Sequence, residues 1–129
     1  MLNDSLANVL SNILNAAKSG KGSCTARPSS KLIEQVLTIM QGNRYVGSYE
    51  IISDGKGNTV KINLIGRINK CGAIKPRFSV KKEDYEKFEK RFLPAKDFGV
   101  LIISTPKGLM THQEAKEKNL GGKLIAYIY

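Results

Sequence analysis

A run of hydroxyl, lysine and glycine residues follows a short apolar segment in the last third of the chain and reads Ser104-Thr105-Pro106-Lys107-Gly108. Hydroxyl groups can hydrogen-bond to phosphates and base edges, and the ammonium group of Lys107 can neutralise a phosphate. Gly108 would let the backbone turn tightly beside a ligand. The same residue types are common in an ordinary turn after a strand, so both interpretations stay open. If the run binds a ligand, we expect the hydroxyls of Ser104 and Thr105 to project from the surface without supporting the core.

A second candidate site lies where Pro28 precedes Ser29, Ser30 and Lys31 at the start of an expected helix. A serine at this position is most often a helix N-cap. Lys31 falls in the first turn, where the helix dipole disfavours a cation. A bound phosphate would resolve that conflict, because it could accept from the free N–H groups, the hydroxyls and Lys31 together. Capping and phosphate binding are compatible here.

A third candidate site is a basic segment that contains Lys70, Lys75 and Arg77. Apolar residues alternate with these cations, which favours structured backbone over a disordered basic tail. We expect the segment to present its cations to a ligand, although any single lysine could simply be solvated.

Charge supports a polyanionic partner for the whole chain of 129 residues, because its net charge is +10. Such an imbalance costs self-repulsion and is typical of proteins that bind polyanions. The charge is also segregated, since no acidic residue lies between Asp4 and Glu34 or between Asp54 and Glu83. Nucleic acid is the first candidate partner and an anionic membrane surface the second. No apolar run has the length of a spanning helix and no signal-peptide pattern is present, so we expect a cytoplasmic protein with no membrane partner.

Catalytic and metal-binding chemistry has little support in the sequence. Cys24 and Cys71 stand apart without C-x-x-C spacing, and His112 is the only histidine, which leaves too few ligands for zinc. We expect reduced thiols and no cofactor. We also expect His112 to be an ordinary surface side chain at the start of an exposed helix, with no nucleophile as a partner. The phosphate-binding spacing G-x-x-x-x-G-K-[ST] is absent. The sequence therefore predicts no enzyme.

The elements that must position these residues fall into two lobes. Residues 1–68 are predicted to form an N-terminal lobe of order α-β-α-β-β. Its parts are a helix over 4–17, a short strand over 23–27, a helix between Pro28 and Gly42, and strands over 44–52 and 59–68 joined by a hairpin turn. The buried stripe of each helix recurs at helical spacing, and the two longer strands alternate.

Residues 69–129 are predicted to form a C-terminal lobe that is mostly β with short helices. Its expected elements are a strand over 73–80 that is interrupted at Pro76, a helix over 82–92, a strand over 99–103, a helix over 111–119 and a strand over 123–129. Thr111 and Glu114 have the spacing of a capping box, which predicts the start of the last helix. The fold class is therefore α+β with two small lobes.

Several of these motifs together resemble the family of the eighth protein of the small ribosomal subunit. The similar segments are 103–111, 114–115, 120–125, 28–32 and 66–78, and the last resembles the archaeal and eukaryotic branch. The resemblance implies a structural, non-enzymatic ribosomal protein that binds an irregular stem in the central domain of small-subunit ribosomal RNA and supports assembly. It also implies neighbouring ribosomal proteins as partners, and we expect a monomer off the ribosome.

The resemblance implies RNA contacts for seven residues, namely Ser29, Ser30, Lys31, Ser104, Thr105, Lys107 and Gly108. The basic segment adds Lys70, Lys75 and Arg77, so ten residues are expected to bind RNA. The third position of the C-terminal loop usually carries a hydroxyl in this family, and Pro106 stands there in this chain. An irregular stem suits side-chain recognition because the deep major groove of A-form RNA excludes side chains. A basic regulator that binds DNA or messenger RNA is the alternative, although no helix-turn-helix pattern with a basic second helix is present.

Overall fold

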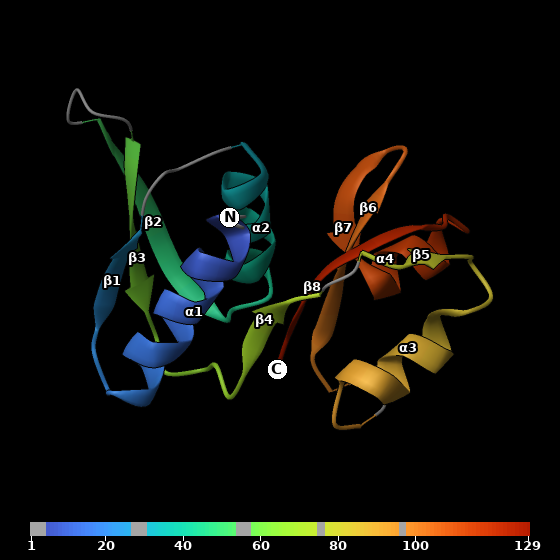
Figure 1. Cartoon of the computed structure of the whole chain (residues 1–129), viewed down its shortest axis with the longest axis horizontal. Helices are drawn as coiled ribbons and strands as arrows, with labels where there is room; N and C mark the ends of the chain where they lie inside the picture. Colours follow the sequence, from blue (N-terminus) through green and yellow to red (C-terminus); the bar gives the residue numbers. More distant parts are fainter. Residues whose placement is uncertain (1–4, 27–30, 54–57, 75–76, 96–97) are drawn as a thin grey trace, which may run out of the picture. The chain divides into compact units, whose positions relative to one another are not determined.

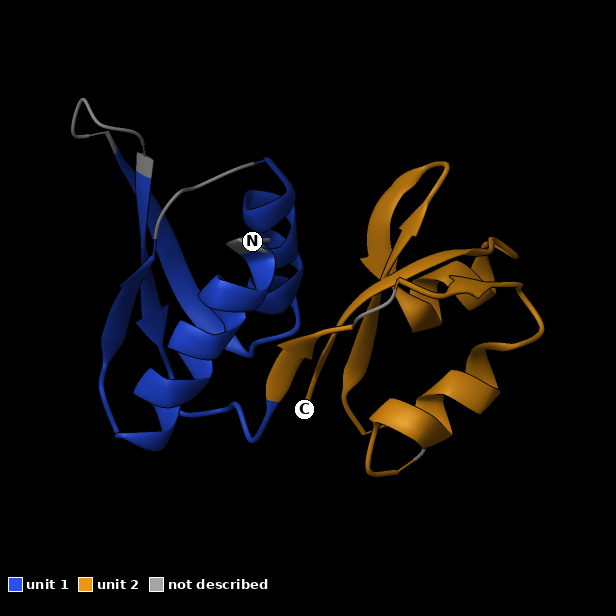
Figure 2. Ribbon diagram, viewed as in Figure 1, with its two compact units in different colours: residues 1–70 blue, residues 71–129 orange. Residues whose placement is uncertain are grey.

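The chain forms two compact units, Met1–Lys70 and Cys71–Tyr129, which Figure 2 shows in different colours. The computed structural model describes residues 5–26, 31–53, 58–74, 77–95 and 98–129. Both units combine helices with antiparallel sheets, so the predicted α+β class is confirmed. The division between the units falls two residues after the boundary expected from the sequence.

The first unit contains two amphipathic helices and a three-stranded sheet. Helix α1 (Ser5–Lys18) and helix α2 (Lys31–Gly42) lie on one side of the sheet in Figure 1. Both helices bury the apolar stripe that their spacing predicts, including Leu10 and Ile13 in α1 and Leu37 and Met40 in α2. Burial of these stripes, rather than helix propensity alone, stabilises helices of this length.

The sheet of the first unit has the strand order β1-β3-β2 and is antiparallel throughout. Its strands are β1 (Ser23–Ala26), β2 (Val46–Ser53) and β3 (Asn58–Leu64). Val60 and Ile62 of the central strand are fully buried, and Lys61 between them is exposed. This alternation follows from the period of two in a strand, which places one face of the sheet against the helices.

The second unit is built on the sheet order β4-β8-β6-β7, and the short strand β5 pairs with β8 on the same edge as β4. Its strands are β4 (Cys71–Ala73), β5 (Ser79–Val80), β6 (Val100–Thr105), β7 (Gly108–Thr111) and β8 (Gly122–Ile128). The expected strand over 73–80 with an interruption at Pro76 is present in part, because β4 ends at Ala73 and β5 covers Ser79–Val80. The two short strands pair with different parts of β8. Pro76 lies outside the described residues.

Two short helices complete the second unit, α3 (Tyr85–Phe92) and α4 (His112–Glu117). Helix α3 packs Tyr85 and Phe88 into a core cluster with Leu101, Ile103 and Leu124 of the sheet. Thr111 caps α4, because its hydroxyl accepts a hydrogen bond from the Glu114 N–H at 3.2 Å. The start of this helix predicted from the capping pattern is therefore confirmed.

Candidate functional site

The C-terminal candidate run is the end of a β-hairpin. Ser104 and Thr105 are the last residues of β6, and Gly108 opens β7, so Pro106 and Lys107 form a two-residue turn. Gly108 has φ of +112°, a conformation that residues with a Cβ rarely adopt. The sequence pattern predicted the end of the strand at Ile103 and missed β7. Pairing of Ser104 with Leu109 and of Thr105 with Gly108 extends the ladder to the turn.

Thr105 stabilises this turn with its side chain. Its hydroxyl donates a hydrogen bond to the Gly108 carbonyl oxygen at 2.8 Å and accepts one from the Lys107 N–H at 3.1 Å. The residue is only 8% exposed. The expectation that the Thr105 hydroxyl projects from the surface is therefore wrong. Its geometry makes Thr105 a positioning residue for Lys107 and Gly108.

Ser104 has the opposite environment, because it is exposed and lies in a polar row across three strands. It pairs with Lys123 of β8, and Lys123 pairs in turn with Ser79 of β5. Directly opposed residues of antiparallel strands point to the same face of the sheet. All three are exposed. Lys123 and Ser79 were not among the expected site residues, and only the pairing of strands that are far apart in the sequence reveals them.

Two glycines allow β8 to approach the hairpin and β5. A Cβ on Gly122 would lie 2.2 Å from the Ser104 carbonyl oxygen, and one on Gly121 would lie 2.7 Å from the Val80 carbonyl oxygen. Helix α3 fixes the preceding turn, because the Tyr85 hydroxyl donates to the Leu120 carbonyl oxygen at 2.6 Å. Burial raises the pKa of this hydroxyl, which keeps it a donor. These contacts hold Lys123 beside Ser104.

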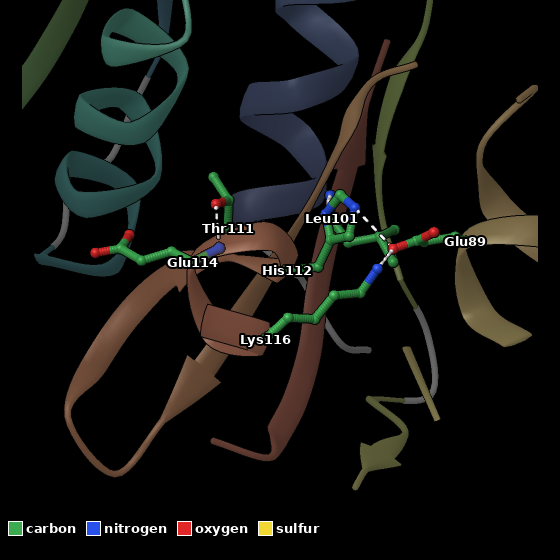
Figure 3. A network of polar contacts seen from close by, with 6 residues as sticks. All are labelled: Glu89, Leu101, Thr111, His112, Glu114 and Lys116. Carbon is green, nitrogen blue, oxygen red and sulfur yellow. Dashed lines mark hydrogen bonds and ion pairs between the residues drawn. The ribbon is translucent and has the colours of Figure 1, made fainter. Parts of the chain in front are cut away.

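A buried polar network supports the strand that leads to the hairpin. His112 is 1% exposed, and its Nδ1 accepts a hydrogen bond from the Leu101 N–H at 3.0 Å. Its Nε2 lies 3.1 Å from Oε1 of Glu89, which also contacts the Lys116 ammonium group (Figure 3). The expectation of an exposed His112 is wrong. The network joins β6, α3 and α4.

The other expected site residues belong to elements other than the hairpin. Lys31 opens α2, Lys70 ends the first unit, and Arg77 lies two residues before Ser79, and all three are exposed. The other three expected residues lie outside the described residues, namely Ser29, Ser30 and Lys75.

The electrostatics of the hairpin favour an anionic ligand. Within the part of the chain that the structure describes, no carboxylate forms an ion pair with Lys107 or Lys123. Both lysines are exposed, so their ammonium groups are available to a ligand. The same part of the chain contains no cluster of three or more His, Cys, Asp or Glu side chains suited to a metal ion. No described helix is long and apolar enough to cross a membrane.

The surface formed by the exposed Ser104 and Lys107 of the hairpin and Lys123 of β8, with no ion pair to either lysine among the described residues, is of a kind that binds nucleic acid. The sequence model of the family Ribosomal protein S8 matches residues 4–129, which is essentially the whole chain. The chain therefore belongs to the Ribosomal protein S8 family. Members of this family are structural proteins of the small ribosomal subunit that bind its ribosomal RNA among neighbouring ribosomal proteins. The recognition of the family from its motifs is confirmed, and so is its assignment to the ribosome.

Proposed function

We propose that this chain is a primary binder of an irregular stem in the central domain of small-subunit ribosomal RNA, and that it supports assembly of the subunit as a monomer. The observation that carries the proposal is the exposed Ser104, which pairs with the exposed Lys123 of the neighbouring strand and lies three residues before Lys107 of the turn. An irregular stem exposes base edges that the deep major groove of regular A-form RNA hides from side chains. A hydroxyl flanked by two cations suits such a site.

The roles of the hairpin residues follow from their environments. Ser104 is exposed and can exchange hydrogen bonds with a base, whereas Lys107 and Lys123 contact phosphates as point charges. Thr105 and Gly108 hold the turn in shape. Pro106 cannot offer a side-chain hydroxyl, so hydrogen bonding to bases falls to Ser104. This division separates recognition of the stem from attraction to its backbone.

Residues outside the hairpin contribute backbone contacts in this proposal. Lys31, Lys70 and Arg77 are exposed cations that can neutralise phosphates. Ser29 and Ser30 belong to the same proposed set on the strength of the family resemblance, and Lys75 belongs to it as part of the basic segment. Similarity of residues 66–78 to the archaeal and eukaryotic branch leads us to propose that this chain represents that branch.

Two RNAs and two variants test the proposal at one salt concentration. We expect Ser104→Ala to lose affinity for an irregular stem while binding of a fully paired stem changes little, because base contacts specify the site. Lys107→Ala should weaken both RNAs alike and reduce the salt dependence of binding by about 0.7–0.9 in log–log slope. Lys90→Ala is a matched control, because Lys90 is exposed on α3 and lies outside the polar row. Equal losses of Ser104→Ala on both stems, or tighter binding of duplex DNA, would refute base recognition.

A further inference from the structure

A side chain closes the base of the β6–β7 hairpin, where its backbone ladder has ended. The ladder runs from the turn to the pair Ile102 and Thr111. The next pair in this register would be Leu101 and His112, but the chain enters α4 at His112. Nδ1 of the His112 imidazole accepts the Leu101 N–H at 3.0 Å. The imidazole therefore supplies the acceptor of one further rung.

The contacts of the two ring nitrogens fix where the proton of His112 lies. Nδ1 accepts a hydrogen bond and carries no proton, so the proton of the neutral ring must lie on Nε2. Nε2 lies 3.1 Å from Oε1 of Glu89 and can donate to it. The Lys116 ammonium group contacts the same carboxylate oxygen (Figure 3). Glu89 therefore has a cationic partner while the His112 ring is neutral.

A second proton on the His112 ring is incompatible with this arrangement. It would place an N–H group at Nδ1, facing the Leu101 N–H, and leave the ring without an acceptor. His112 is 1% exposed, so water cannot replace the lost bond while the fold stays closed. Attraction to Glu89 would favour the charged ring, but Lys116 already neutralises that carboxylate. Uptake of a proton must therefore accompany opening of the contact between His112 and Leu101.

The charged groups around the ring come from two helices. Among the described residues, Glu89 of α3 contacts the ring and Lys116 of α4 contacts Glu89. Glu114 of α4 points away from the ring in Figure 3 and pairs with Lys118 at 3.3 Å. Strands β6 and β7 contain no ionisable side chain. Histidine is the side chain that ordinarily titrates between about pH 5 and 8, and His112 is the only histidine of the chain.

We propose that His112 is a proton-sensitive clamp of the hairpin. The neutral ring holds β6 to the start of α4, and protonation in mild acid releases that contact. The segment between the two clamped residues is the hairpin that carries Ser104 and Lys107. His112 is therefore a positioning residue for the proposed RNA site, and it acts through Leu101 and the ladder. The clamp itself does not depend on RNA, whereas its consequence for binding rests on the proposed function.

Urea unfolding at several pH values tests the clamp through stability. An opened histidine binds a proton below about pH 6.5, whereas the closed ring excludes it. The stability that the clamp contributes is therefore present at neutral pH and is lost as the pH falls. His112→Asn is the matched variant, because its amide keeps an acceptor near the position of Nδ1 and does not titrate. Between about pH 6.5 and 5, the unfolding equilibrium constant of the unmodified chain should rise by up to about tenfold per pH unit more than that of the variant. Equal pH dependence of the two proteins would refute the clamp.

Nitrogen NMR of the unmodified protein tests the state of the ring and needs no variant that folds. Because His112 is the only histidine, a chain with ¹⁵N-labelled histidine gives ring signals from one residue. At about pH 7.5, we expect an unprotonated Nδ1 and a protonated Nε2. As the pH falls, protonation of Nδ1 should coincide with a change in the amide signal of Leu101. A proton on Nδ1 at neutral pH, or protonation that leaves the Leu101 signal unchanged, would overturn the proposal.

Binding of the irregular stem separates the positioning role from the proposed function. Between about pH 7.5 and 5.5, the affinity of the unmodified protein should fall several-fold more than that of His112→Asn, and effects of pH on the RNA itself cancel in this comparison. If the two proteins lose affinity equally while their unfolding differs, the positioning role is refuted and the proposed function stands. If neither protein binds an RNA stem, the proposed function and the positioning role are both refuted, and the unfolding and NMR results still decide whether the clamp exists.

Discussion

Replacing Thr105 with valine should lower the stability of the hairpin, although the two side chains have nearly the same shape. The Thr105 hydroxyl makes two hydrogen bonds, to the Gly108 carbonyl oxygen at 2.8 Å and from the Lys107 N–H at 3.1 Å. Each contributes about 0.5–1.5 kcal/mol, so their loss should reduce the free energy of unfolding by about 1–3 kcal/mol. The side chain is 8% exposed, so water can replace these bonds only in part. The smaller end of the range applies if the turn opens to solvent.

Ser104→Ala provides the comparison, because Ser104 is exposed and its side chain makes neither of the two hydrogen bonds that hold the turn. Its unfolding free energy should change by less than about 0.5 kcal/mol. Urea denaturation measures the stability of both variants, and filter binding measures their affinity for the irregular stem. We expect Thr105→Val to lose stability first and Ser104→Ala to lose affinity alone. If Thr105→Val kept full stability and lost affinity only for the irregular stem, Thr105 would be a direct base contact and the positioning role would be wrong.

Three further predictions concern the supports of the site and the first unit. Gly122→Ala should lower the unfolding free energy by about 1–3 kcal/mol through overpacking, because its Cβ would meet the Ser104 carbonyl oxygen. Gly42→Ala is the control, because its Cβ would lie in open space on α2, and it should not destabilise the chain in the same urea titration. His112→Phe keeps a ring but removes the acceptor of the Leu101 N–H and a partner of Glu89. Thermal and urea unfolding should therefore show that the free energy of unfolding falls by about 2–4 kcal/mol. A decrease of less than about 1 kcal/mol would show that the network contributes little to stability. Lys31→Ala should weaken binding of the irregular and the fully paired stem alike. The circular dichroism spectrum should stay unchanged, since a cation in the first helical turn does not stabilise α2. Lower thermal stability with unchanged RNA affinity would contradict this prediction.

Periodicity in the sequence was sufficient for the long amphipathic elements. The apolar stripes of α1 and α2 and the alternation of β3 are local patterns in the sequence. Each pattern places its apolar side chains on one face of the element, and burial of that face removes them from water. The capping pair Thr111 and Glu114 was equally local, because both partners lie within one turn. Strand β7 was missed because its four residues, Gly108–Thr111, do not alternate clearly and are fixed by pairing with β6.

The sequence by itself determined the family, the positive charge and the position of the hairpin run, since these depend on residue types and their order. Only the tertiary structure decided what each residue does. Thr105 and His112 are polar residues that were expected on the surface, and both are buried. Burial is possible because each finds hydrogen-bond partners, Gly108 within the turn for Thr105 and Leu101 on another element for His112. Lys123 became a neighbour of Ser104 only through the register of β8 against β6. Strand register joins residues that are far apart in the chain, and no local pattern encodes it completely.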